Sequence, residues 1–85
     1  MLMCMPLPSP KHSQAPLLVA VGEALRARRK ELGVSQEQLA LIAGVDRAYV
    51  GGVERGEHNL TLMTLGQISK ALKLTPSQLL KAARN

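Results

Sequence analysis

Residues 36–55 read QEQLALIAGVDRAYVGGVER, and this stretch decides the fold. Small and aliphatic side chains recur at helical spacing on both sides of Gly44, namely Leu39, Ala40 and Ala43 before it and Val50 and Val53 after it. Gly44 can adopt the positive φ that a sharp turn requires, and Ala40 is small enough for two steeply crossing helices to approach closely. The pattern therefore predicts two helices joined by a tight turn, which is a helix-turn-helix.

Start and stop signals bound the two predicted helices. Ser35 is followed three residues later by Gln38, which is the spacing of a capping box, so the first helix is expected to begin there and to end at Gly44. Asp46 stands in the place of an N-cap for the second helix. We expect this second helix to end at about Arg55, because Gly56 follows it.

Helical spacing continues on both sides of this stretch. A helix is expected from Leu17 to Gly33, a fourth from about Leu62 to Leu72, and a last one that begins at Thr75–Pro76. No segment has the pattern of a strand. Five helices with short connections predict a compact all-α domain over residues 17–85. Residues 1–16 hold four of the five prolines and show no periodicity, so we expect a disordered N-terminal tail.

Charge and composition restrict the partners. The chain of 85 residues has 11 Lys and Arg against 6 Asp and Glu, which gives a formal net charge of +5. This excess favours a polyanionic partner, and both nucleic acid and an acidic membrane surface meet that condition. No apolar run reaches the roughly 18 residues of a membrane helix, and the first residues lack the pattern of a signal peptide. We therefore expect a cytoplasmic protein without a membrane partner.

Reactive and metal-binding residues are sparse. Cys4 is the only cysteine, and His12 and His58 are the only histidines, so neither an internal disulfide nor a four-ligand zinc site can be assembled from them. No Ser-His-Asp or Cys-His arrangement is evident. We expect no enzymatic activity, no metal, no cofactor and no small-molecule ligand.

Taken together, these motifs resemble the helix-turn-helix domain of phage repressors of the Cro and C1 type, also called the XRE family. The resemblance covers residues 18–80 and depends on LGVSQEQLA at 32–40 and VERG at 53–56. It implies a lambda-repressor-like fold and a transcription regulator or repressor that binds double-stranded DNA sequence-specifically. Residues 46–55 would be its recognition helix, placed in the major groove of a palindromic operator.

The resemblance also implies roles for individual residues. Those that match base-reading positions are Arg47, Ala48 and Gly52. Those that match DNA-backbone positions are Gln36, Tyr49, Arg55, His58, Asn59 and Thr61. Arg47 is the strongest candidate for sequence reading, because its guanidinium can pair with both major-groove acceptors of guanine; the alternatives are a solvated helix charge and a phosphate contact. Arg29 and Glu54 match a structural salt bridge between the first and third helices.

Gly51 and Gly52 depart from the usual pattern, because two glycines inside a helix cost about 1 kcal/mol each relative to alanine. One hypothesis is that the missing side chains let the helix backbone approach DNA closely. The alternative is that both positions face solvent.

The expected partners of the chain leave several alternatives open. The resemblance implies a homodimer, and its interface could include apolar residues of the last two helices that could equally belong to the monomer core, namely Leu62, Met63, Leu74, Leu79 and Leu80. Within the family, the chain is similar to the small controller proteins of restriction-modification systems, with phage repressors and antitoxins as comparable alternatives. A different class of function would be an antitoxin or adaptor module that uses the same fold to bind a protein partner.

Overall fold

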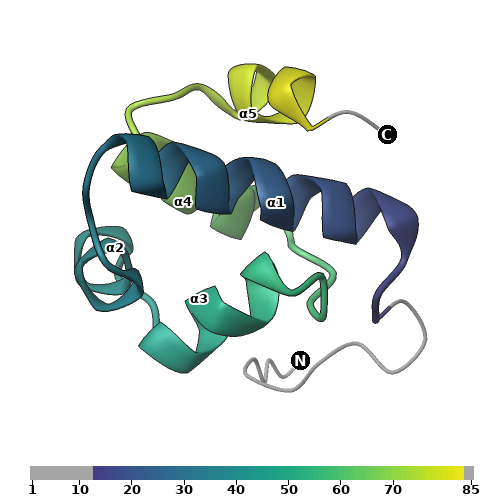
Figure 1. The fold of residues 1–85 in the computed structure, drawn as a ribbon, viewed down its shortest axis with the longest axis horizontal. Helices are drawn as coiled ribbons and strands as arrows, with labels where there is room; N and C mark the ends of the chain where they lie inside the picture. Colours follow the sequence, from purple (N-terminus) through teal and green to yellow (C-terminus); the bar gives the residue numbers. More distant parts are fainter. Residues whose placement is uncertain (1–12, 84–85) are drawn as a thin grey trace.

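The structure, a computed structural model, describes residues 13–83 and contains five α-helices (Figure 1). The helices are α1 (Pro16–Glu31), α2 (Gln36–Ala43), α3 (Arg47–Glu54), α4 (Leu62–Ala71) and α5 (Pro76–Ala82). No strand occurs in this described part of the chain. The predicted all-α fold with five helices is therefore confirmed.

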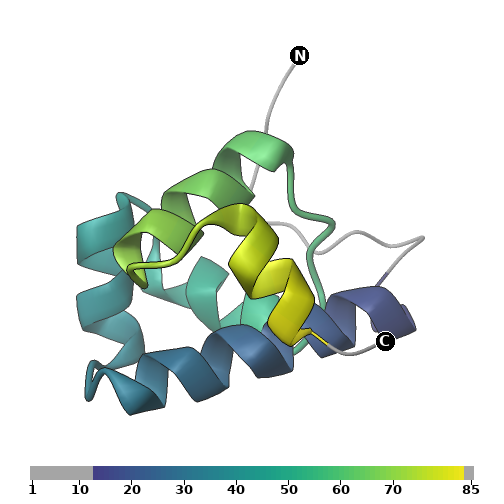
Figure 2. The ribbon, with the colours of Figure 1, turned by 90° about the horizontal axis from the view of Figure 1, so that it is seen from above.

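Helix α1 is the centre of the arrangement. It runs between α3 on one side and α5 on the other (Figure 1), and it packs against both. Helix α4 packs against α2 and α5 (Figure 2). Helices α2 and α3 pack against each other and form one edge of the molecule (Figure 1). The predicted helix-turn-helix thus lies at the surface, supported from behind by α1 and α4.

The core is aliphatic, as a chain with a single aromatic residue requires. Its buried members are Leu25, Leu39, Ala40, Ala43, Val50, Val53, Leu65, Ile68, Leu72 and Leu79. Every helix contributes to this cluster, so the helix-turn-helix residues pack against α1, α4 and α5 as well as against each other. Leu79 is fully buried, which assigns this candidate for the dimer interface to the monomer core.

Local sequence signals explain most of the helix ends. Ser35 and Gln38 form the predicted capping box, with the Gln38 backbone N–H donating to the Ser35 hydroxyl at 3.0 Å. Gly44 ends α2 with φ of +75°, a conformation in which a Cβ would be strained. Asp46 differs from the expectation: it occupies the N-cap position of α3, but its side chain makes no capping hydrogen bond.

The folded domain begins earlier than the predicted boundary at residue 17. Helix α1 starts at Pro16, and Gln14 forms hydrogen bonds with Arg55 and Gly56, the two residues that follow α3. The Gln14 backbone N–H donates to the Gly56 carbonyl at 2.7 Å, and its side chain donates to the Arg55 carbonyl at 2.6 Å. Because these bonds join segments far apart in the sequence, residues 14–16 belong to the domain. The remainder of the predicted tail, residues 1–12, lies outside the described residues.

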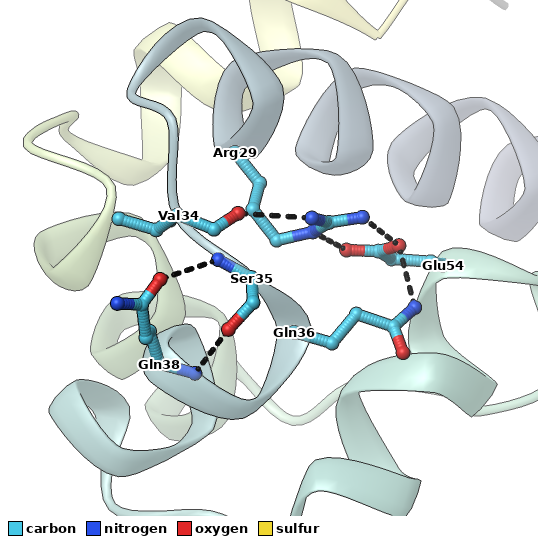
Figure 3. A network of polar contacts seen from close by, with 6 residues as sticks. All are labelled: Arg29, Val34, Ser35, Gln36, Gln38 and Glu54. Carbon is cyan, nitrogen blue, oxygen red and sulfur yellow. Dashed lines mark hydrogen bonds and ion pairs between the residues drawn. The ribbon is translucent and has the colours of Figure 1, made fainter.

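A buried ion pair ties α1 to α3 (Figure 3). Arg29 Nε donates to Glu54 Oε2 at 2.7 Å, and Arg29 Nη2 donates to Glu54 Oε1 at 3.1 Å. Only 10% of the Arg29 side chain and 3% of the Glu54 side chain are exposed. Arg29 Nη1 also donates to the Val34 carbonyl at 3.0 Å, and Gln36 Nε2 donates to Glu54 Oε1 at 3.0 Å. The pair therefore joins α1, the α1–α2 connection, α2 and α3.

Removal of one partner should destabilise the domain strongly. We expect Arg29→Ala to lower the free energy of unfolding by about 3–5 kcal/mol, because the Glu54 carboxylate would stay buried without its countercharge. Urea denaturation followed by circular dichroism measures this change. The double variant Arg29→Met/Glu54→Leu removes both charges and should recover most of the loss. A loss below about 1 kcal/mol in Arg29→Ala would show that the pair is not buried in solution.

Candidate nucleic-acid interface

The first turn of α3 presents the two candidate base-reading residues that have side chains. Arg47 and Ala48 are both exposed at the start of the helix, whereas Val50 and Val53 on its other face are buried. Arg47 forms no ion pair with any residue in the described part of the chain. Its guanidinium can therefore reach a ligand without first breaking an internal ion pair.

Gln36 begins α2 and lies beside α3 (Figure 3). It is half-buried, and its amide donates to Glu54 Oε1, so the buried ion pair orients this side chain. The N-terminal end of α2 also carries the positive end of the helix dipole. An oriented amide at such a position is suited to a phosphate group.

Arg55 is the C-cap residue of α3, and its side chain is 61% exposed. It pairs with Glu57: Nε donates to Oε2 at 2.8 Å and Nη2 donates to Oε1 at 3.2 Å. The hydrogen bonds with Glu57 raise the pKa of Arg55, and the same contact lowers the pKa of the Glu57 carboxyl. Both groups are thus charged at neutral pH, and Glu57 offsets the positive charge that Arg55 would offer to a phosphate.

The rings of Tyr49 and His58 form a tilted contact beside α3. Their ring centroids are 4.6 Å apart with an interplanar angle of 33°. Tyr49 is half-buried; burial raises the pKa of its phenol, and a hydrogen bond with the Thr64 side chain lowers it by less. His58 is only 6% exposed. The expectation that His58 lies at the surface to contact the DNA backbone is corrected, since its imidazole is packed inside the domain.

Gly52 faces this same histidine. A Cβ added at Gly52 would collide with Nε2 of the His58 ring and would lie 2.7 Å from its Cδ2. Gly52 is also buried, as is Gly51. The solvent-facing alternative for the two glycines is therefore wrong. The base-reading position expected for Gly52 is corrected as well, because the space that a side chain would take is filled by the protein itself.

The two remaining backbone candidates lie in the connection after α3. Asn59 and Thr61 are exposed. Thr61 is the N-cap of α4, and its hydroxyl accepts a hydrogen bond from the Thr64 backbone N–H at 3.0 Å. This cap supports the start of α4.

Three further polar contacts, not all of them near α3, were not predicted from the sequence. They are the bonds of Gln14 to the end of α3, the hydrogen bond from Arg28 Nε to the Leu72 carbonyl at 3.0 Å, and the Arg55–Glu57 pair. Only the last has a local signal, since an acidic residue two positions after an arginine at a helix end can fold back onto it. The other two join residues 41 and 44 positions apart.

Residues 13–83 contain neither a metal-ligand cluster nor a membrane-spanning helix. No three histidine, cysteine, aspartate or glutamate side chains in this range gather as a metal site would require. No helix there is both long enough and apolar enough to cross a lipid bilayer.

Known proteins resemble this chain over most of its folded part. The helix-turn-helix family model matches residues 25–79. The control protein C.SmaI of Serratia marcescens is 47% identical over 60 residues, which cover 71% of each chain. The crystal structure of the restriction-modification controller protein C.AhdI from Aeromonas hydrophila is also 47% identical, with a TM-score of 0.71 over 73% of this chain and 94% of that one.

A third relative extends the match at the level of structure. The hypothetical transcription factor NHTF from Neisseria has a TM-score of 0.73 and 34% identity, and the alignment covers 94% of this chain and 84% of the other. The family model, these relatives and the exposed first turn of α3 lead to one conclusion: the chain belongs to the XRE-type helix-turn-helix family of DNA-binding transcription regulators.

Proposed function

We propose that the protein is a controller-type regulator that inserts α3 into the major groove of a palindromic operator. The observation that supports this most directly is the exposed first turn of α3, which presents Arg47 from a helix whose opposite face is packed into the core. The 47% identity to two restriction-modification control proteins favours a controller over the antitoxin or adaptor alternative. We also propose that the protein acts in the cytoplasm, and a duplex DNA partner is consistent with that location.

The proposed contacts divide between bases and backbone. Arg47 would pair with guanine through two parallel hydrogen bonds, and Ala48 would contact a thymine methyl group. The proposed backbone contacts are Gln36, Tyr49, Arg55, Asn59 and Thr61. These residues come from α2, α3 and the connection to α4, so one DNA strand could touch all three segments.

Substitution of Arg47 should change which sequence is bound. We expect wild-type protein to select a consensus from a random duplex pool, and Arg47→Ala to lose discrimination at one base pair by about 1–3 kcal/mol. Sequencing of the bound pools measures this preference. Arg26→Ala removes the same charge from an exposed site on α1 and should leave the consensus unchanged.

Salt dependence separates base reading from phosphate binding. If Arg47→Ala weakened binding equally for all sequences and reduced the salt slope by about 1, Arg47 would be a phosphate contact and its base-reading role would be wrong. A wild-type protein that binds no duplex even at low salt would contradict the proposed function itself.

We also propose that the regulator is a homodimer that uses α4 and α5. Leu62 and Met63 at the start of α4 are 84% and 78% exposed, and Leu80 on α5 is 45% exposed. Leu74 is half-buried against the core and contributes less to such a surface. Helices α4 and α5 pack together, so the exposed side chains belong to neighbouring elements. Burial of this apolar surface would offset the small core of the monomer.

A charge on this surface should weaken the dimer. We expect Met63→Glu to raise the dimer dissociation constant by a factor of about 10 or more, since each protomer would bury an unpaired carboxylate. Sedimentation equilibrium measures the constant. Leu41→Glu is the matched control, because Leu41 is equally exposed but lies on α2. Dissociation caused by Leu41→Glu and not by Met63→Glu would place the interface on α2.

A further inference from the structure

Gly51 lies where two candidate phosphate ligands converge. A Cβ built on this glycine would lie 3.2 Å from Arg55 Nη1, 3.6 Å from Gln36 Oε1 and 3.9 Å from Gln36 Nε2. Arg55 comes from the end of α3 and Gln36 from the start of α2, so the two side chains reach the same point from different helices. Glycine is unfavourable in a helix interior, so Gly51 lowers the stability of α3 relative to alanine at the same position.

Both converging side chains are held by carboxylates. Glu54, itself bound to Arg29, accepts from the Gln36 amide at 3.0 Å. Glu57 accepts from Nε and Nη2 of Arg55 at 2.8 and 3.2 Å, so Nη1 is the guanidinium nitrogen that is turned toward Gly51. The ends of Arg55 and Gln36 are thereby each held within 4 Å of the Cβ position of Gly51.

We propose that Gly51 is a positioning residue for DNA-backbone binding: its missing Cβ leaves room for Arg55 Nη1 and for the second N–H of Gln36 Nε2, the one not given to Glu54, to donate to one phosphate. This inference rests on the proposed function. It assigns a role in DNA binding to Gly51, which has no side chain of its own to contact DNA. The neighbouring Gly52 differs, because its missing Cβ makes room for the buried His58 ring. Of the two glycines, only Gly51 therefore borders candidate ligands of DNA.

A methyl group at Gly51 would act on geometry and leave the fold intact. A contact of 3.2 Å is tighter than most real Cβ contacts, so the exposed Arg55 end would have to move by a few tenths of an ångström. Charge-assisted hydrogen bonds to phosphate have short, restricted lengths, so a displaced guanidinium would bind a phosphate shared with Gln36 more weakly. Alanine is also the better helix former, which should raise thermal stability.

The test combines thermal melting with a double-mutant cycle. Gly51→Ala should melt at or above the wild-type temperature, yet bind the duplex selected by the wild-type protein about 3–10-fold more weakly. In an Arg55→Ala background, Gly51→Ala should change the affinity by less than about twofold, because the ligand it displaces is already absent. Fluorescence anisotropy of the labelled duplex measures all four affinities.

Two control variants define the stability change. Gly66→Ala on α4 has no atom within 4 Å of its Cβ, so its melting temperature reports the gain in helix propensity alone. Gly52→Ala should melt below the wild-type temperature, because its Cβ collides with His58.

Each other outcome would overturn the proposal in a distinguishable way. Wild-type affinity in Gly51→Ala would show that the converging side chains do not need the glycine. If Gly51→Ala weakened DNA binding equally in the wild-type and the Arg55→Ala backgrounds, the added Cβ would contact DNA directly. That result would support the close approach of the helix backbone to DNA considered above. Failure of the wild-type protein to bind any duplex would overturn the proposed function, and this role with it, before any variant is compared.

Discussion

The buried pair of Arg29 and Glu54 is the interaction on which the helix-turn-helix depends. Helices α2 and α3 have only eight residues each, and helices of that length are marginal without tertiary packing. The ion pair joins α3 to the long helix α1, and Gln36 joins α2 to the same carboxylate. Because a buried charge without its partner is costly, this one contact favours a single relative placement of three helices.

Side chains of the candidate interface are held in place by the groups that they contact. Buried polar groups orient side chains nearer the surface: Glu54 accepts a hydrogen bond from Gln36, and the buried His58 ring packs at a tilt against Tyr49. Glu57 does the same for Arg55 while offsetting its charge, so the net positive charge of the chain overstates what this corner of the interface offers to DNA. Under the proposed function, the exposed first turn of α3 would read the sequence, while the supported residues would contact the DNA backbone.

The small aliphatic core limits the stability of the monomer. Leu79 and Leu74 are used to complete it, but Leu62 and Met63 stay exposed. A second copy that covers them would add stability and also set the distance between two α3 helices, which a palindromic operator requires. Stability and recognition would then depend on the same surface of α4 and α5.

Local patterns in the sequence determined the helices, the caps at Ser35 and Thr75 and the turn at Gly44, because helix periodicity and capping act over a few residues. The ion pair of Arg29 with Glu54 was implied only by family resemblance, since charges 25 positions apart carry no local signal. The tertiary structure alone decided that Gln14 belongs to the domain, that His58 is buried, and that Gly51 and Gly52 make room for side chains of this same chain. The side chain that occupies the space beside a glycine comes from another segment of the chain, and tertiary packing decides where that segment lies.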